Sequence, residues 1–347
     1  MGQQQQQQRQ WRSFLKLILF SSMGGSLGVL GVLFTLALSL VKVLIHPRKW
    51  TRFDLHTFTP FELGLPGEAV AFPPREGNYL VSGWYIPYPE ATTTILLCPG
   101  YRCKAEYVLN LALPLWNAGH TLLVFEYYGH GAPVMTPVTL GYREINDFLG
   151  AVAYIRARAP AAGLGVLAYS MGASVALMAG AQTNDVEAFV VDSAFATHRR
   201  VLAYNFRRSV HLPFGLVALM TDQLLWRLAG YHLDQVEPLR DIGRLAPRPV
   251  LLIQGEKDSV VDPQDALLLY QAANAPKELW IVPEAEHCGA YFVDRLAYIA
   301  RVITFFDLHL KKKLPSSPTK NAFQEREGPN DLRDGLAEEG WTWTSSA

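Results

Sequence analysis

A serine stands between two apolar segments in the stretch GVLAYSMGAS. The residues before Ser170 have the pattern of a short buried strand, and the small residues after it have the pattern of a closely packed helix. A turn of this kind holds the hydroxyl out from the sheet and places the N–H groups of the helix beside it. Gly172 suits so tight a turn, whereas Ala168 stands where a glycine is usual. We therefore predict that Ser170 is a nucleophile.

Two later loops supply the groups that a nucleophilic serine needs. Serine is a poor nucleophile near neutral pH, so it requires a general base, and the base requires an acid that fixes its tautomer. Asp258 lies just past a predicted strand in LLIQGEKDSVVD, and His287 follows the next strand in PEAEHCGAY. The chain order serine, aspartate, histidine is typical of a nucleophile on a strand-to-helix turn. We predict that His287 is the base and Asp258 the acid.

Other side chains of the right type have simpler interpretations. Asp192 and Asp262 are rivals for the acid, but Asp192 is expected to hold a backbone turn under a helical cap. Glu256 is interpreted as a solvated loop charge. His130 lies in a loop flanked by glycines, which indicates a structural role. Cys288 lies on no sharp turn, so an inert thiol is expected.

Acyl transfer through a tetrahedral intermediate also needs two oriented N–H donors for the oxygen that becomes negatively charged. One is predicted to be the backbone N–H of Met171, at the start of the helix after the serine. The other is predicted to be the N–H of Tyr101 in CPGYR, where Gly100 permits an unusual turn after a strand. These two backbone groups form the predicted oxyanion hole.

The elements that must position these residues alternate between strands and helices. Such alternation predicts an α/β fold with a mostly parallel central sheet and helices on both faces. The predicted strands of this part are 94–98, 121–127, 165–169, 186–192, 248–254 and 277–283, and the predicted helices are 107–116, 143–158, the segment after residue 170, 262–274 and 291–310. Short strands at 54–60, 68–72 and 79–89 are expected to enter the sheet in antiparallel fashion.

An apolar run without ionisable side chains extends over 17–41. As a helix rising 1.5 Å per residue it would be about 37 Å long, enough to cross a hydrocarbon core of about 30 Å. Trp11 and Trp50 flank it at plausible interface depths. We predict a polar tail over 1–16 and a transmembrane anchor over 17–45, with a cleaved signal peptide as the alternative. Basic residues on the two sides nearly balance, which leaves the orientation open.

A mostly helical segment at about 196–246 interrupts the alternation and is predicted to be a cap within a hydrolase domain spanning 48–310. Its apolar side chains either line an acyl pocket or face the bilayer, or else they only pack the cap onto the domain. These side chains are Leu216, Leu219, Leu224, Leu225, Trp226 and Leu228. The polar segment 311–347 is predicted to be a disordered tail.

The composition excludes several classes of function. The 347 residues carry a formal net charge of zero, whereas nucleic-acid binding needs a strongly basic face. Three cysteines are too few for a disulfide framework, and no CxxC pair offers a zinc site. We expect no metal and no cofactor, and the oligomeric state stays open.

The motifs AYSMG, GEKDSVVD, EHCG and CPGY with YYGHG together resemble the α/β-hydrolase superfamily. The apolar span and the short helical cap are similar to its membrane-anchored, BEM46-like esterase and lipase-like members. The resemblance covers roughly residues 60–310 and implies the α/β-hydrolase fold. CPGY stands where many relatives have a His-Gly pair, a departure that concerns rate and pocket shape more than the reacting groups.

These observations predict a membrane-anchored serine hydrolase that cleaves a carboxylic ester or thioester of a lipid-like or acylated substrate through an acyl-enzyme. A peptidase or an acyltransferase would use the same residues. The contrasting alternative is a binding protein that has kept the fold and lost turnover.

Overall fold

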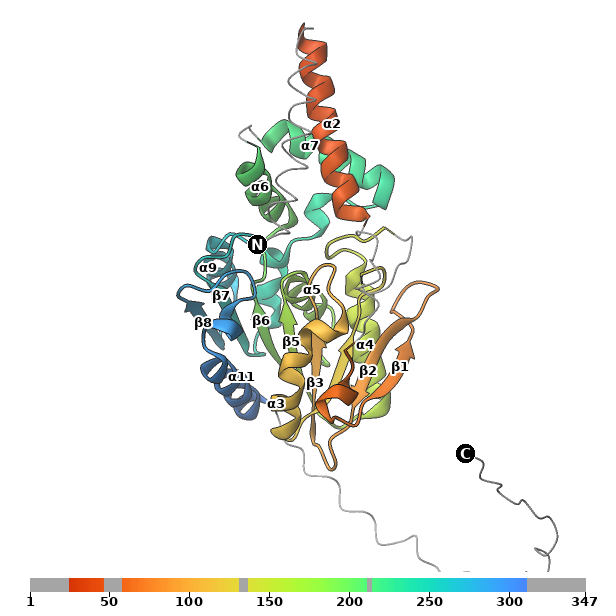
Figure 1. The fold of residues 1–347 in the computed structure, drawn as a ribbon, viewed down its shortest axis with the longest axis vertical. Coiled ribbons are helices and arrows are strands. Elements are labelled where there is room, and N and C mark those ends of the chain that lie inside the picture. Colours follow the sequence, from red (N-terminus) through yellow and green to blue (C-terminus); the bar gives the residue numbers. More distant parts are fainter. Residues whose placement is uncertain (1–24, 47–57, 131–136, 211–213, 311–347) are drawn as a thin grey trace, which may run out of the picture. The chain divides into compact units, whose positions relative to one another are not determined.

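Eight strands form one sheet in the computed structural model, in the order β1-β2-β4-β3-β5-β6-β7-β8 (Figure 1). The structure describes residues 25–46, 58–130, 137–210 and 214–310. The strands are β1 (Glu68–Phe72), β2 (Val81–Ile86), β3 (Thr93–Cys98), β4 (Thr121–Phe125), β5 (Gly163–Tyr169), β6 (Ala188–Asp192), β7 (Val250–Gly255) and β8 (Lys277–Val282). β2 is antiparallel to both β1 and β4, and the remaining pairs are parallel. The prediction of a mostly parallel sheet with an antiparallel entry is confirmed.

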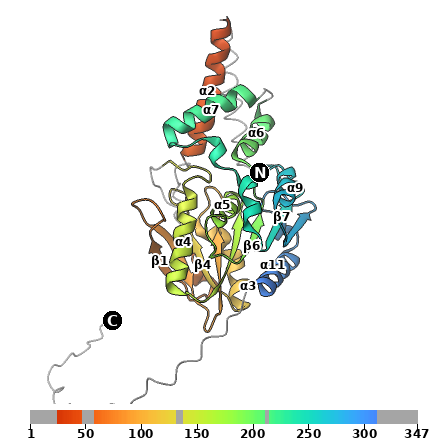
Figure 2. The same ribbon diagram turned by 180° about the vertical axis from the view of Figure 1, so that it is seen from behind.

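The central strands are buried along their whole length, because helices cover both faces of the sheet. The helices around the sheet are α3 (Ala112–Asn117), α4 (Glu144–Arg158), α5 (Met171–Gly180), α9 (Gln264–Ala272), α10 (Ala290–Val293) and α11 (Arg295–His309). α3 and α11 share one apolar core with the sheet, and α4 and α5 share the other. Figure 2 shows α4 on the side opposite to α3 and α11.

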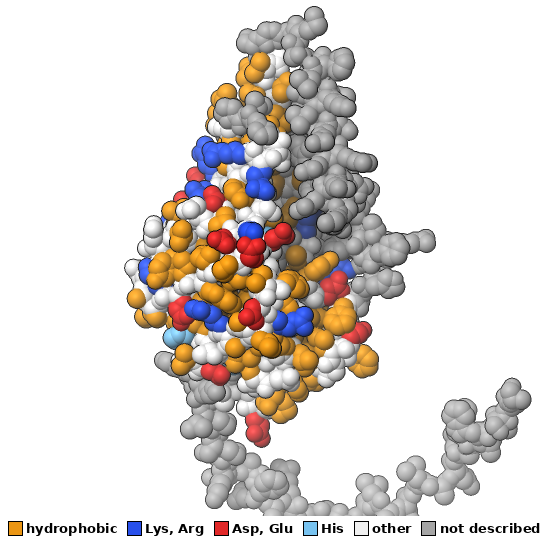
Figure 3. All heavy atoms as spheres, turned by 60° about the vertical axis from the view of Figure 1, so that its left-hand side comes forward, with side chains coloured by type: hydrophobic (Ala, Val, Ile, Leu, Met, Phe, Trp, Pro, Cys, Tyr) orange, Lys and Arg blue, Asp and Glu red, His pale blue; other side chains and the backbone are white. Residues whose placement is uncertain are grey.

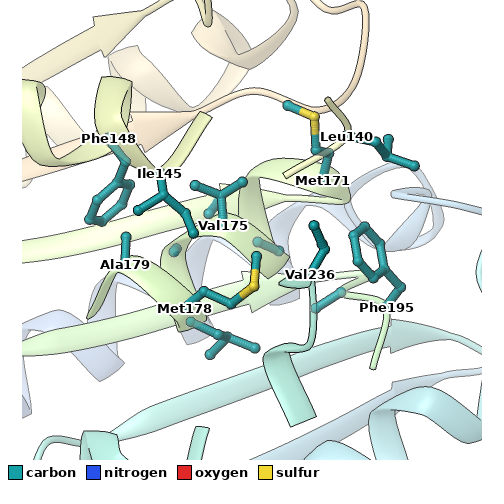
Figure 4. Packing of buried hydrophobic residues seen from close by; sticks show 14 of the residues in the cluster. Leu140, Ile145, Phe148, Met171, Val175, Met178, Ala179, Phe195 and Val236 are labelled. Atoms are coloured by element: carbon teal, nitrogen blue, oxygen red, sulfur yellow. The ribbon is translucent and has the colours of Figure 1, made fainter. Parts of the chain in front are cut away.

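α5 is packed closely against α4, which fixes the position of the turn that precedes α5. Figure 4 shows Val175, Met178 and Ala179 of α5 beside Ile145 and Phe148 of α4. All ten residues of α5 are buried. A helix held on every side in this way gives its N-terminus a fixed direction.

The segment between β6 and β7 is helical, as predicted for a cap. It contains α6 (His198–Ser209), α7 (Phe214–Ala229), η4 (Leu233–Gln235), α8 (Pro238–Asp241) and η5 (Ile242–Leu245). α6 reaches the loop after β7, because the Tyr204 hydroxyl donates to the carbonyl of Asp258 and the Asn205 amide donates to that of Val260. The cap therefore stands at the edge of the sheet where the parallel strands end.

α2 (Gly25–Ile45) lies within the predicted anchor and packs against α7 of the cap. It is long and apolar enough to cross a membrane over Gly28–Ile45, by length and composition. One face of its C-terminal half is buried, through Leu36, Ala37, Val41, Leu44 and Ile45. The predicted tails at 1–16 and 311–347 lie outside the described residues.

Three local predictions need correction. The predicted strand 54–60 lies partly outside the described residues, and its end begins a 3₁₀-helix, η2 (Pro60–Leu63). Thr59 and Glu62 form a capping box there, which favours a helical start over a strand. The predicted helix 107–116 divides into η3 (Ala105–Leu111) and α3. The predicted helix 291–310 divides where the Asp294 side chain caps α11 by accepting from the N–H of Ala297.

Candidate active site

Ser170 lies at the turn from β5 to α5, with φ 52° and ψ −120°. This positive φ is disfavoured for any residue with a side chain, so the packing around the turn must maintain it. A Cβ on Gly172 would lie 2.3 Å from the carbonyl oxygen of Pro99, so only glycine fits there. A Cβ on Gly100 would lie 3.3 Å from the Ser170 Cβ, so the loop after β3 approaches the serine closely.

The structure brings the three predicted reacting side chains together. His287 Nε2 lies 2.8 Å from Ser170 Oγ, and His287 Nδ1 lies 2.7 Å from Asp258 Oδ2. The three residues come from the ends of three parallel strands, β5, β7 and β8, which end at the same edge of the sheet. The His287 side chain keeps 20% of its surface exposed, and that of Asp258 is fully buried. This is a serine, imidazole and carboxylate in hydrogen-bonded series, with the serine partly open to solvent.

Asp258 accepts hydrogen bonds at both carboxylate oxygens. Its Oδ1 accepts from the N–H groups of Val260 and Val261, each at 2.8 Å. Its Oδ2 accepts from the Gln254 amide at 2.9 Å in addition to His287. Burial acts to raise the pKa of Asp258, but the hydrogen bond from His287 and the two backbone N–H groups outweigh it, and the pKa is lowered. Asp258 is therefore an ionised acceptor that orients the imidazole.

Asp192, the rival acid, holds the loop that carries His287. The Ser193 hydroxyl donates to Asp192 Oδ1 and accepts from the N–H of Cys288 at 3.0 Å. The Tyr298 hydroxyl of α11 donates to Asp192 Oδ2. Burial is the main reason that the pKa of Asp192 is raised to about 6. The Asp192 carboxylate thus accepts from two side-chain hydroxyls and supports the His287 loop through Ser193, whereas the expectation was a backbone turn under the cap.

The two residues predicted to supply the oxyanion hole belong to segments that lie next to Ser170. Met171 is the first residue of α5, and the first N–H groups of a helix have no partner within it. The N–H of Ser170 itself already donates to the carbonyl of Asp192. Tyr101 follows Gly100, whose backbone lies against the serine. The start of α5 and the loop after β3 therefore both lie next to Ser170.

The remaining residues considered from sequence lie in supporting positions. His130 is fully buried, and its Nδ1 accepts from the N–H of Arg102 at 3.0 Å. Asp262 accepts from Arg200 of α6 and from the N–H of Gln264, and so connects the segment before α9 to the cap. Burial raises the pKa of the Cys288 thiol well above its ordinary value, which keeps the thiol protonated.

Sequence reasoning missed three polar residues that position the site. Gln254, Ser193 and Glu144 are all buried. Gln254 is a polar residue at the end of the apolar strand β7, and this was the one local signal that pointed to the carboxylate four residues later. The partners of Ser193 and Glu144 depend on loops far away in the sequence.

In the part of the chain that the structure describes, this site coincides neither with a cluster of metal-binding side chains nor with the pocket beside α4. Among the described residues, no group of three or more His, Cys, Asp and Glu side chains is placed to hold a metal ion. A pocket of about 880 Å³ lies beside α4 and is lined in part by Arg75, Tyr79 and Asp147. None of the three hydrogen-bonded residues lines it, so it is separate from the site.

Comparison with protein families agrees with this architecture. The model of the prolyl oligopeptidase family matches residues 137–313, a range that contains the serine, the aspartate and the histidine. The chain is 27% identical over 237 residues to the uncharacterized protein YqkD of Bacillus subtilis, covering 67% of this chain and 77% of that one. It is 22% identical over 254 residues to the protein bem46 of Schizosaccharomyces pombe, covering 71% of this chain and 79% of that one.

Among solved structures, the esterase Pf2001 of Pyrococcus furiosus is similar, with a TM-score of 0.64 and 22% identity. The match covers 77% of this chain and 99% of the esterase. A likeness at this level of identity concerns the fold. It confirms the α/β-hydrolase fold that the motifs predict.

Proposed function

Because the chain belongs to the prolyl oligopeptidase family of α/β-hydrolases, we propose that it is a membrane-anchored serine hydrolase that cleaves carboxylic esters or thioesters. The observation that carries the proposal is the pair of short contacts from His287, 2.8 Å to Ser170 Oγ and 2.7 Å to Asp258 Oδ2. A nucleophile, a base within hydrogen-bond reach and a group that orients the base are what covalent acyl transfer requires.

The reaction begins when Ser170 Oγ attacks the carbonyl carbon of the substrate. His287 Nε2 takes the hydroxyl proton, while Asp258 holds the proton on Nδ1 and stabilises the imidazolium. When the bond from the carbonyl carbon to the leaving oxygen or sulfur breaks, His287 returns the proton to the leaving group. Water then attacks the acyl-enzyme, its proton passes to His287, and the bond to Oγ breaks as Oγ regains a proton.

Both tetrahedral intermediates carry negative charge on the former carbonyl oxygen. The N–H groups of Met171 and Tyr101 are proposed to donate to this oxygen. The start of α5 adds a favourable electrostatic field, because the N-terminus of a helix carries partial positive charge. Donors fixed by the fold before substrate binds need little reorganisation during the reaction.

A lipid-like substrate and a membrane partner are supported by the surface of the cap. Leu216, Leu219, Trp226 and Leu228 of α7 are exposed, whereas Leu225 is buried. α7 packs against α2, whose Val29, Leu30 and Phe34 are also exposed. Two adjoining helices thus present large apolar side chains to the surroundings, an arrangement typical of membrane contact.

Basic side chains lie next to this apolar surface. The last turn of α6 carries Arg207 and Arg208, both exposed. Figure 3 shows lysine and arginine side chains on the upper part of the molecule, at the level where Figure 1 has α6. Cations at this position favour the anionic headgroups of a bilayer in which α2 is embedded.

The proposed chemistry is tested by labelling membranes that contain the protein with a fluorophosphonate probe. We expect the wild-type protein and the Ser209→Ala variant, which changes an exposed serine, to be labelled equally. The Ser170→Ala variant should not be labelled. Absence of labelling in the wild type, or labelling that survives Ser170→Ala, would contradict the hydrolase proposal.

The substrate class is tested with p-nitrophenyl esters, monoacylglycerols, lysophospholipids and acyl thioesters, with N-acylpeptides alongside. The proposal expects ester or thioester cleavage to dominate. Faster cleavage of the peptides would favour the peptidase alternative, to which the name of the family points. Acyl transfer to an added alcohol in preference to water would favour an acyltransferase. For the anchor, the intact protein should stay with membranes after carbonate washing.

A further inference from the structure

The C-terminal end of α2 lies against the loop that follows β3. The last carbonyl groups of a helix have no partner within it and need one elsewhere. The Tyr101 hydroxyl donates to the carbonyl of Leu44 at 2.6 Å and lies 3.1 Å from that of Val43. The Arg102 guanidinium donates to the carbonyl of His46 at 3.1 Å. Two neighbouring side chains of the loop therefore cap the end of the apolar helix.

The same two residues, Tyr101 and Arg102, belong to the proposed oxyanion loop. Arg102 has φ 60°, a left-handed conformation that is unfavourable for arginine and persists only under outside constraint. Its N–H donates to His130 Nδ1 at 3.0 Å. Because Nδ1 accepts this hydrogen bond, Nε2 is the ring nitrogen that can donate. The Tyr101 ring lies edge-on to the His130 ring, with centroids 5.5 Å apart.

His130 is held in turn by Glu144. Its Nε2 lies 3.0 Å from Glu144 Oε1, and both side chains are buried. Glu144 also accepts from the N–H and the hydroxyl of Thr139 and from the N–H of Gly141. Burial acts to raise the pKa of Glu144, but the hydrogen bonds from His130 and Thr139 outweigh it, and the pKa falls to about 2. The ionised carboxylate thus connects His130, Thr139 and Gly141.

The network returns to α2 through the segment before Thr139. The N–H of Val138 donates to the carbonyl of Ile45 at 3.0 Å. The helix end is thus bound on one side by Tyr101 and Arg102 and on the other by the segment that Glu144 organises. A displacement of α2 would remove a partner from the loop after β3 and one from the segment before Thr139.

We propose that α2, besides anchoring the chain, positions the oxyanion loop through the side chains of Tyr101 and Arg102. The inference rests on the proposed serine hydrolase function and adds a second role for the apolar helix. Tyr101 then acts twice: its N–H binds the oxyanion, and its hydroxyl ties the loop to the helix. Arg102, His130 and Glu144 are positioning residues that act through this loop.

The test is the Tyr101→Phe variant of the full chain, which keeps the ring and the backbone N–H and removes only the hydroxyl. Loss of a whole oxyanion donor costs roughly 10²–10³ in kcat, so a donor that is only loosened should cost about tenfold. We expect kcat for a p-nitrophenyl ester to fall by that factor with KM unchanged. The double variant Tyr101→Phe with Arg102→Met should fall further. Tyr154→Phe, which removes a hydroxyl on α4 bonded to Arg158, is the matched control and should match the wild type.

A second readout separates positioning from general damage. A trifluoromethyl ketone forms a tetrahedral adduct with the serine, and its oxygen occupies the oxyanion position. Because the adduct resembles the transition state, its Ki should rise by the factor by which kcat/KM falls. A change in kcat below twofold, or an unchanged Ki, would overturn the inference. The proposed function would still stand if fluorophosphonate labelling depends on Ser170. If the wild type is not labelled at all, both fail.

Discussion

Two loops lie next to Ser170 and are held in different ways. The loop that carries His287 is fixed from within the sheet, since the N–H of Cys288 donates to Ser193, and Ser193 donates to Asp192 at the end of β6. Tyr298 of α11, a helix packed on the sheet, completes this support. The support thus comes from the end of β6, from the bend that follows it and from α11.

The loop after β3, the proposed oxyanion loop, is held largely from outside the sheet. Its partners are the end of α2, through Tyr101 and Arg102, and the buried pair of His130 and Glu144. The loop that carries His287 is therefore held by the sheet and α11, whereas the proposed oxyanion loop is also bound to the end of α2. Substitutions in the reacting groups and in the two supports should have different consequences.

The largest effect is expected where both supports stay intact and a reacting group changes. Asp258→Asn should lower kcat by roughly 10⁴-fold, because an amide no longer holds the imidazole in the required tautomer. Asp262→Asn, four residues later, is the matched control and should stay within about twofold, since the Asp262 carboxylate accepts from Arg200 and from a nearby N–H. Steady-state ester hydrolysis measures both. A larger loss in Asp262→Asn would instead identify the rival acid as the functional one.

The support of the oxyanion loop is expected to contribute strongly to stability as well. Glu144→Gln places an amide NH₂ where a carboxylate oxygen accepts from two donors, so a buried network is broken. We expect unfolding free energy to fall by roughly 3 kcal/mol, measured by denaturant titration. A decrease below 1 kcal/mol would mean that the network adapts, and that the oxyanion side is not specially constrained.

The two buried carboxylates should give opposite pH dependences. Asp192 has a pKa of about 6 in the folded chain, above its ordinary 3.8, so the folded state binds the proton more tightly. Stability from this group falls as pH rises from about 4 to about 6 and is then constant. Glu144, with a pKa of about 2, contributes stability that is present above about 4.5 and lost only in stronger acid.

The measurement is the thermal midpoint of Asp192→Asn relative to the wild type between pH 4 and 8. From pH 4 to about pH 6, the thermal midpoint of the variant should rise by a few degrees relative to that of the wild type. Above about pH 6 the difference should stay constant. His287 and Asp258 also act on Asp192, and both are present in the two proteins compared. If the difference in thermal midpoint does not change with pH, the pKa of Asp192 is the same in the folded and the unfolded chain.

Much of the fold could be predicted because its signals are local. Buried parallel strands are unbroken apolar runs, and the nucleophile turn has its own small-residue pattern. Ser170, Asp258 and His287 could be picked by position after successive strands, and the structure brings them into hydrogen-bond contact. Their catalytic roles stay a prediction, as do those of the Met171 and Tyr101 N–H groups.

The supports could not be predicted, because they depend on which loops meet in space. Nothing near Glu144 in the sequence indicates that its carboxylate bonds to His130, fourteen residues earlier, and that His130 holds a loop after β3. The misassigned end of the strand 54–60 is different, since Thr59 and Glu62 carry a capping signature that is readable in sequence. Local rules suffice for elements and fail for buried polar networks.

The smallest effect is expected at Tyr204, whose contact can be compared with that of Tyr101. Tyr204 of the cap resembles Tyr101, because its hydroxyl donates to a backbone carbonyl, that of Asp258, at 3.0 Å. Yet the Asp258 carboxylate is already held by Gln254 and by two N–H groups of its own loop. Tyr204→Phe should therefore change kcat by less than about twofold and stability by about 1 kcal/mol. If ester hydrolysis instead falls as far as in Tyr101→Phe, the acid side also depends on an outer helix, and the cap rather than α2 alone organises the site.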